Sequence, residues 1–432
     1  MTAKAEASSR FVSVTERLLL FIVVAYPLLL LTLKKWMNTC LFVAAPLALI
    51  VILTKNKGKT VLSPGARHWV ILFGVVFFSP VVGGLLAQIW RNEINIGHLD
   101  NLSKFLFAFP VFYYLTTVKF NPLRYYEWNI PVSVYVTAIF VYFFPDLEWG
   151  ANRVTTYFVD PQSFSSLSLI LGFCSLSLID LHQQDQIVIK LFKFGAFLLG
   201  LYLSFISVSR AGWLAIPFGL ALWLKVRKKL PIWQVGVLVG VVVALILNFF
   251  PLVTEKILRA VNEIQAYQWD GLNRETSVEE RFTFFRIACE LLKLHPVAGW
   301  GDKGFVVALN LPQITAFAIE STRFYPVDHG FHNEFFTQMV RSGLLGVIPI
   351  LAVFFIPTVL FVKALRHTDK IVQGYGLLAM NYYLVVLITS ISTEVYNIKF
   401  VSAFHAMTLA ILSSIIIRQI YINAADTIEP GT

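Results

Sequence analysis

Long apolar blocks, separated by short polar segments, run through the whole sequence. A bilayer selects blocks of this length, because a membrane-spanning helix needs about 20 mostly apolar residues. A helix of a soluble core would instead carry its apolar residues in a stripe with helical spacing. We therefore predict an all-α membrane protein with about twelve transmembrane helices. The predicted spans are 18–33, 41–54, 68–90, 103–118, 130–144, 165–181, 191–208, 212–224, 232–253, 343–363, 371–392 and 401–420.

Composition supports the membrane assignment and argues against nucleic acid as a partner. Charged residues make up 14% of the chain, whereas soluble domains usually carry about 25%. The net charge is +10, but the Lys and Arg residues lie mainly in short loops and form no basic stripe interleaved with aromatic residues. The three cysteines, Cys40, Cys174 and Cys289, have neither a disulfide-framework spacing nor a zinc spacing.

The basic loops also predict the orientation of the chain. Twelve spans place both termini on one side of the membrane, and the positive-inside rule makes that side cytoplasmic. Lys34 and Lys35 are a minor exception on the opposite side, and the absence of a convincing cleavage site before them favours a retained first helix. The basic groups on the predicted cytoplasmic side are Lys55, Lys57 and Lys59; Lys119 and Arg124; Lys225, Arg227, Lys228 and Lys229; and Lys363, Arg366 and Lys370.

This pattern divides the chain into three parts. Residues 1–253 hold transmembrane helices 1–9, residues 254–342 form a large loop outside the cytoplasm, and residues 343–432 hold helices 10–12 and a cytoplasmic tail. The loop contains Trp, Phe and Leu throughout, so we expect it to fold. Ser277 and Glu280 fit a capping box, which predicts a helix that ends before His295-Pro296.

Arg210 is the first candidate for function, because it lies between two apolar spans. A charge at that depth is costly and usually serves function. Orientation alone would favour an arginine on the cytoplasmic side, yet the predicted topology places Arg210 outside. The small residues beside it, Ser209, Ala211 and Gly212, allow a tight turn and a close approach by a ligand. The alternative is an arginine that extends to lipid headgroups.

Two arginines of the predicted loop helix are candidates for phosphate binding, since the planar guanidinium group binds phosphate through two parallel hydrogen bonds. Arg281 has no obvious helical partner. Arg286 has one in Glu290, four residues later. We therefore favour Arg281 for function over Arg286.

Two histidines, His329 and His332, precede the span 343–363 and lie beside Asp328 and Glu334. A neutral histidine can accept a proton from a hydroxyl group near neutral pH. The same four side chains form only a weak metal-site pattern, because the two histidines have no further ligands nearby. We expect neither a metal nor another cofactor.

Four motifs in this order give the chain a resemblance to the O-antigen ligase and polymerase superfamily. Their order and spacing around one large loop are more specific than any single motif. The motifs are Ser209-Arg210-Ala211-Gly212, Ser277 to Glu280-Arg281, His295-Pro296-x-x-Gly299-x-Gly301, and His332-Asn333-x-Phe335.

The resemblance implies a GT-C-like membrane glycosyltransferase in the inner membrane of a Gram-negative bacterium. Such an O-antigen ligase transfers a glycan from undecaprenyl pyrophosphate to lipid A–core at the periplasmic face, in lipopolysaccharide biosynthesis. By position, Arg210 and Arg281 would bind the pyrophosphate and His332 would activate the acceptor. The family often has Arg, Gly and Asn before the sixth span. Here Arg153 is followed by Thr155-Thr156, and Gln162 stands where Asn is usual.

The expected site residues are consistent with the chemistry of this reaction. Arginines can neutralise the leaving pyrophosphate without a metal, and a histidine base assists the attacking hydroxyl. Direct displacement would invert the anomeric centre, although Asp328 and Glu334 leave a covalent intermediate open. The predicted catalytic residues are His332, Arg210 and Arg281, and the predicted substrate-binding residues are Arg286, Arg153, Gln162, Asn333 and His329.

Three other functions remain open. An O-antigen polymerase uses the same donor with a lipid-linked glycan as acceptor, and a protein O-oligosaccharyltransferase transfers to Ser or Thr. A transporter or flippase would show inverted repeats and charges at the membrane midplane, whereas the candidate charges here lie at the outer edge.

Overall fold

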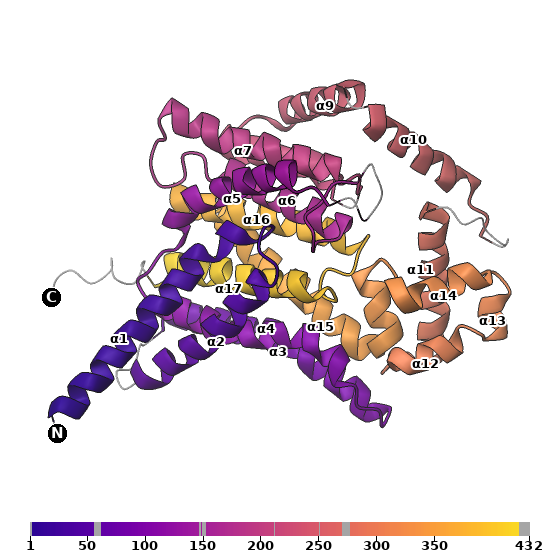
Figure 1. Cartoon of the computed structure of the whole chain (residues 1–432), viewed down its shortest axis with the longest axis horizontal. Coiled ribbons are helices and arrows are strands. Elements are labelled where there is room, and N and C mark those ends of the chain that lie inside the picture. Colours follow the sequence, from indigo (N-terminus) through magenta and orange to yellow (C-terminus); the bar gives the residue numbers. More distant parts are fainter. Residues whose placement is uncertain are drawn as a thin grey trace.

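Helices make up the regular structure of the part of the chain described by the computed structural model, residues 2–55, 62–146, 148, 153–210, 212–249, 251–269 and 277–422 (Figure 1). The predicted all-α fold class is confirmed. The helices of the bundle are α1 Thr2–Ala25, the 3₁₀ helix η1 Tyr26–Leu29, α2 Trp36–Lys55, α3 Pro64–Trp90, α4 Ile96–Thr117, α5 Leu123–Phe143, α6 Pro161–Ser177, α7 Ile187–Ile206, α8 Ala215–Arg227, α9 Ile232–Phe249, α15 Glu334–Leu365, α16 Lys370–Ser390 and α17 Lys399–Tyr421.

Each of the twelve predicted spans falls on one of these helices, but the helices differ in length and apolarity. Among the described residues, seven segments are long and apolar enough to cross a membrane. The remaining five include α6 with 17 residues and α8 with 13 residues, which are short for a crossing. A membrane protein with at least seven such helices is therefore supported, and twelve spans stay a prediction. The seven are Phe11–Leu29, Trp36–Lys55, Pro64–Trp90, Ile187–Ile206, Glu334–Leu365, Lys370–Ser390 and Lys399–Tyr421.

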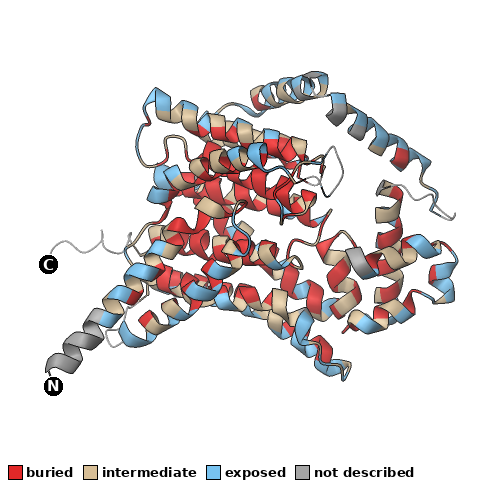
Figure 2. Cartoon of the chain, in the orientation of Figure 1, coloured by how far each residue is buried: buried red, intermediate tan, exposed pale blue. Residues whose placement is uncertain are grey.

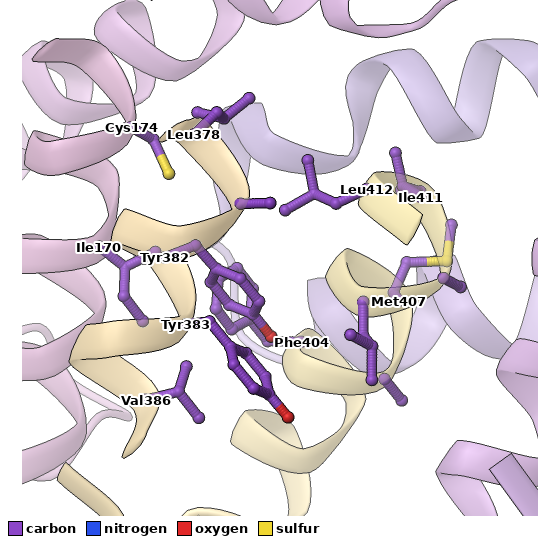
Figure 3. Packing of buried hydrophobic residues seen from close by; sticks show 14 of the residues in the cluster. Ile170, Cys174, Leu378, Tyr382, Tyr383, Val386, Phe404, Met407, Ile411 and Leu412 are labelled. Carbon is purple, nitrogen blue, oxygen red and sulfur yellow. The ribbon is translucent and has the colours of Figure 1, made fainter. Parts of the chain in front are cut away.

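Helix α17 is the centre of the bundle. It packs against α2, α3, α4, α15 and α16, and most of its residues are buried (Figure 2). Around it, Tyr382 of α16 and Phe404 of α17 pack with Ile170 and Cys174 of α6 (Figure 3). Helices α9 and α10 (Pro251–Ala266) lie at the edge of the molecule and contact few other elements.

The large loop folds into several short helices with a hydrophobic cluster of their own. The cluster gathers Phe284, Ile287, Leu291, Phe305 and Ile314. The capping-box helix is observed as α11, Ser277–Leu294. Four further helices were not predicted from the sequence: α10, α12 (Gly301–Ala308), α13 (Pro312–Thr315) and α14 (Glu320–His329).

The first turns of α15 belong to the loop side of the molecule, because the helix breaks at Gly343 (φ 59°, ψ −147°). The turn after α11 packs into this break. Leu344 N donates to Pro296 O at 2.8 Å, and Trp300 N donates to Val340 O at 2.8 Å. Only glycine fits at the contact, since a Cβ on Gly299 would lie 2.6 Å from Gly343 N.

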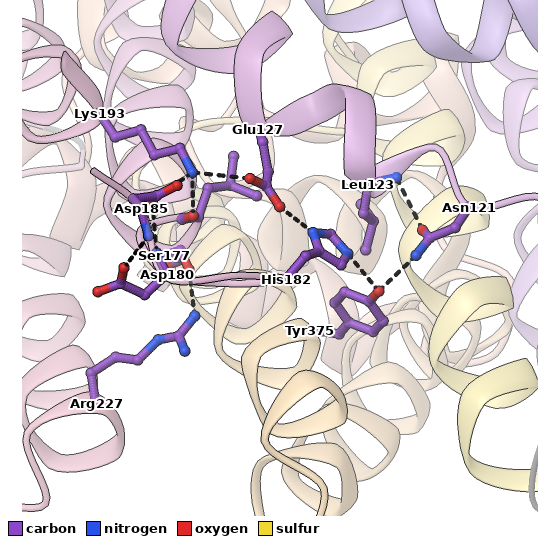
Figure 4. Close-up of polar contacts among 11 residues, drawn as sticks. Asn121, Leu123, Glu127, Ser177, Asp180, His182, Asp185, Lys193, Arg227 and Tyr375 are labelled. Carbon is purple, nitrogen blue, oxygen red and sulfur yellow. Dashed lines mark hydrogen bonds and ion pairs between the residues drawn. The ribbon is translucent and has the colours of Figure 1, made fainter. Parts of the chain in front are cut away.

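A buried polar network joins α5, α7 and α16 at the other end of the bundle (Figure 4). Lys193 is fully buried and donates to Glu127 at 3.1 Å and to Asp185 at 2.8 Å. His182 contacts Glu127 through Nδ1 and Tyr375 through Nε2. Lys193 also donates to Leu178 O at 2.9 Å. Two carboxylates and a carbonyl thus surround the buried ammonium, which would be costly to bury without partners.

Candidate functional site

A cavity of about 820 Å³ lies where the loop helices meet one end of the bundle. Helices α4 and α15 show which end this is. Their N-terminal residues Asn101 and Arg341 line the cavity, whereas Lys119 and Lys363 lie at their opposite ends. The cavity is therefore formed at the end of the bundle away from these basic loops. The other polar lining residues are Asn95, Arg153, Asp160, Gln162, Ser209, Arg210, Glu280, Arg281, Asp302, Tyr325, His332, Thr393, Glu394 and Asn397.

Three arginines from three distant segments converge on the cavity. Arg153 comes from the segment before α6, Arg210 from the turn after α7, and Arg281 from α11. Burial lowers the pKa of the Arg281 guanidinium, and the positive charge of Arg210 lowers it further, while Glu280 opposes this effect. Two cations close enough to repel each other form a site that favours an anion between them.

The turn that carries Arg210 has a strained backbone. Val208 has φ 54°, a left-handed conformation that is a true outlier for a β-branched residue. The surrounding packing holds this turn, because Ser165 of α6 donates to Ser209 O at 3.0 Å. A Cβ on Gly212 would lie 2.7 Å from Leu169 Cδ1, so the turn lies directly against α6.

His332 lies in a second left-handed turn, with φ 51°. Its Nε2 is 3.3 Å from the hydroxyl oxygen of Tyr325, and their ring centroids are 5.5 Å apart. Burial and the negative charge of Glu280 raise the pKa of the Tyr325 hydroxyl, while Arg281 and Arg153 lower it. Tyr325 therefore connects the histidine with the arginine group.

Glu394, from the segment between α16 and α17, holds the turn before His332. Its Oε1 accepts from Phe331 N at 2.7 Å and from the Thr337 hydroxyl, and its Oε2 accepts from Asn397 at 2.9 Å. Gly330 has φ 74° and lies directly against this carboxylate. The position of His332 thus depends on a carboxylate from a distant part of the chain.

The structure brings five of the eight predicted site residues to the cavity: Arg153, Gln162, Arg210, Arg281 and His332. Gln162 lies in the first turn of α6, whose N-terminus is capped by Asp160. The side chain of His329 lies outside the described residues.

The other two predicted site residues lie away from the cavity. Asn333 is buried and caps α15, accepting from Phe335 N at 2.9 Å, and its amide donates to Ile391 O. Arg286 does not pair with Glu290 as expected from their spacing. Its guanidinium lies over the ring of Phe317 at 3.9 Å and over Trp269, and Glu290 pairs with Lys293 instead.

Only one of the two carboxylates considered as alternative nucleophiles, Glu334, has a described side chain. Glu334 is fully buried, accepts from Gln338 at 3.0 Å and from Tyr396 N at 2.9 Å, and does not line the cavity. The side chain of Asp328 is outside the described residues. Within the described part of the chain, no group of three or more His, Cys, Asp or Glu side chains is suited to hold a metal ion.

Sequence reasoning missed several residues of the cavity. Tyr325 and Glu394 were not singled out, and neither were Asn95, Asp302 and Arg341. A signal existed for Glu394, because it lies between two apolar spans in the same way as Arg210. The polar stretch 91–102 was placed outside the cytoplasm, but nothing in it distinguished Asn95 from its neighbours.

Comparison with known proteins supports the resemblance noted in the sequence. The sequence model of the family described as O-antigen ligase matches residues 195–351. An uncharacterized protein of Haemophilus influenzae is 25% identical over 350 residues, which cover 78% of this chain and 83% of that protein. The matched family region contains Arg210, Arg281, Tyr325 and His332. Residues 195–351 of the chain are thus similar in sequence to the family described as O-antigen ligase.

Proposed function

We propose that this protein is an O-antigen ligase, which transfers a glycan from undecaprenyl pyrophosphate to lipid A–core at the periplasmic face of the inner membrane. One observation carries the proposal. Arg153, Arg210 and Arg281 meet His332 in one large cavity at the end of the bundle away from the basic loops. A cationic group beside a histidine matches a reaction with an anionic leaving group and a hydroxyl nucleophile.

In this proposal the arginines bind the pyrophosphate of the donor. The charge on the leaving pyrophosphate grows as the glycosidic bond breaks, and arginines fixed beforehand stabilise that charge without reorganising. Arg210 and Arg281 repel each other, and an anion between them would relieve this repulsion. These residues provide charge compensation that other enzymes obtain from a divalent metal.

His332 is the proposed general base for the acceptor hydroxyl. A base must lie within hydrogen-bond reach of the proton that it removes, and the ring of His332 lies at the cavity beside Tyr325. Attack by that hydroxyl on the anomeric carbon, with departure of the pyrophosphate, inverts the configuration in a single displacement. Glu334 is bonded on both oxygens and lies off the cavity, which argues against Glu334 as the nucleophile of a covalent intermediate.

The orientation follows from the distribution of basic residues. The loops at the opposite end of the bundle carry Lys119, Arg124, Lys363, Arg366 and Lys370, and such loops face the cytoplasm. The cavity would then open at the periplasmic side, where the lipid-linked donor and lipid A–core are both available.

An O-antigen polymerase is the second candidate, because the same family sequence and the same donor are compatible with it. Mass analysis of lipopolysaccharide from a deletion strain distinguishes the two. Loss of a ligase leaves lipid A–core without O-antigen, while lipid-linked O-antigen chains remain. Loss of a polymerase leaves lipid A–core that carries one repeat unit. Unchanged lipopolysaccharide would contradict both functions.

A further inference from the structure

We propose that the cavity wall made by Asn95, Asn101 and Asn397 is a subsite for an uncharged sugar of the acceptor, separate from the arginine group that takes the pyrophosphate. The inference rests on the proposed function and extends it. It names the chemical class of the acceptor group and the side chains that recognise it.

Two polar groups of different character line the cavity. The first contains Arg153, Arg210 and Arg281. The second comes from the segment between α3 and α4, the first turns of α4, the start of α12, the first turns of α15 and the segment between α16 and α17. It contains three primary amides, two carboxylates and one guanidinium: Asn95, Asn101, Asn397, Asp302, Glu394 and Arg341.

The three amides are held in place by their own hydrogen bonds. Asn95 Nδ2 donates to Asp302 Oδ2 at 2.7 Å, Asn101 Nδ2 donates to Asn397 O, and Asn397 Nδ2 donates to Glu394 Oε2 at 2.9 Å. Lys104 is buried and donates to Asn101 Oδ1 at 2.7 Å, so this hydrogen bond fixes the oxygen of that amide. Fixed polar groups bind a ligand with little further loss of conformational entropy.

Each amide still has a donor for a ligand. A primary amide carries two N–H groups, and each of the three uses one of them. No second acceptor for these amide groups occurs among the residues that the structure describes. Sugar hydroxyls donate and accept, so they can pair with such amides and with the carboxylate oxygens beside them.

The charge of this wall selects against phosphate. Asp302 forms an ion pair with Arg341 at 3.1 Å, and Glu394 accepts three hydrogen bonds from neutral donors. Two carboxylates therefore face the cavity beside one guanidinium, with the Lys104 ammonium behind Asn101. This wall has no net positive charge, so a phosphate group is attracted to the arginines instead, whereas a neutral sugar is accepted here.

The position of this wall fits the proposed displacement. In a single inverting step, the acceptor hydroxyl attacks the anomeric carbon from the face opposite the leaving pyrophosphate. Glu394 belongs to the amide wall and also bonds Phe331 N, the residue before His332. The base therefore lies where the two groups meet, so that a hydroxyl of a sugar on the amide wall reaches it.

The test measures binding of two probes to the full-length protein in detergent. The acceptor probe is a core oligosaccharide, released from lipopolysaccharide and dephosphorylated, and the donor probe is undecaprenyl pyrophosphate. We expect Asn95→Ala, Asn101→Ala and Asn397→Ala each to raise the Kd of the oligosaccharide about fivefold to tenfold, the loss of one or two hydrogen bonds. The Kd of undecaprenyl pyrophosphate should stay unchanged, which also shows that the variants are folded.

Asn310→Ala is the matched control, since Asn310 is an exposed amide near the end of α12 that does not line the cavity. Arg210→Gln should weaken the donor probe and leave the oligosaccharide unaffected. Unaltered oligosaccharide binding in all three amide variants, or tighter binding of the phosphorylated oligosaccharide, would overturn the subsite. Failure of undecaprenyl pyrophosphate to bind the wild type would instead count against the proposed function.

Discussion

Replacing Gly330 with alanine tests whether the turn before His332 is held as the structure indicates. Gly330 has φ 74°, and an added Cβ would lie within 2.5 Å of Glu394 Cδ. With ψ 172° this backbone lies in a region that essentially only glycine occupies, which costs an alanine about 1–3 kcal/mol. Moving Glu394 away breaks its bond with Phe331 N, and a hydrogen bond to a charged group contributes about 1.5–3 kcal/mol. We expect a destabilisation of about 2.5–6 kcal/mol.

The assay is equilibrium unfolding in mixed micelles, together with glycan transfer by the same preparations. Gly74→Ala is the control, because a Cβ there meets no atom within 4 Å, and alanine in a helix is more favourable than glycine by about 1 kcal/mol. Transfer by Gly330→Ala should fall by about 100-fold, since a displacement of about 1 Å near the chemistry can have that effect.

A double-mutant cycle separates the two contributions. In a Glu394→Ala background the carboxylate is gone, so Gly330→Ala should destabilise only through its backbone, by about 1–3 kcal/mol. The same cost of Gly330→Ala in both backgrounds would show that Glu394 does not lie against Gly330. A Gly330→Ala protein with wild-type stability and transfer would refute the whole argument.

Three further predictions follow from the cavity and the basic loops. His332→Ala should abolish transfer while undecaprenyl pyrophosphate still binds, and His329→Ala should retain activity. The measurement is complementation of lipopolysaccharide synthesis by each variant at matched membrane expression. The reverse result would identify His329 as the base. Transfer should persist in excess chelator, and activity that chelator removes and Mg²⁺ restores would contradict a metal-independent reaction. Transfer should fall at least tenfold in Arg210→Lys, because lysine lacks the planar guanidinium group. Single cysteines placed at 265–269 should react with a membrane-impermeant reagent from the periplasm, and labelling only from the cytoplasm would invert the topology.

The membrane helices were predictable because their signal is local. A long apolar block by itself predicts a helix in lipid, and each predicted span overlaps an observed helix. Arg210 could be found for the same reason, since a charge between apolar blocks is conspicuous wherever the fold places it. The capping box likewise predicted α11, because it needs only residues within one turn.

The composition of the cavity was less predictable because it depends on contacts between distant segments. Arg281 and Arg286 lie on one helix, and five residues at 100° each place them on different faces. Their spacing separates them but does not say which face meets the cavity. Asn95, Asp302 and Arg341 come together only through the packing of α3, α12 and α15. No local pattern distinguishes Asn95 from other loop asparagines.

The contact between the break in α15 and the turn after α11 limits how this protein can be altered. The break leaves backbone groups of α15 without helical partners, and Pro296 O and Val297 O accept from Leu344 N and Leu345 N. If residues 254–342 are exchanged for the loop of a relative, those N–H groups keep acceptors only where the new turn approaches Gly343 as closely as Gly299 does here. Chimeras should therefore be joined on the C-terminal side of Leu345, so that both partners of the contact come from one parent. The loop that lines the cavity and the membrane helix that it packs against must therefore come from the same protein.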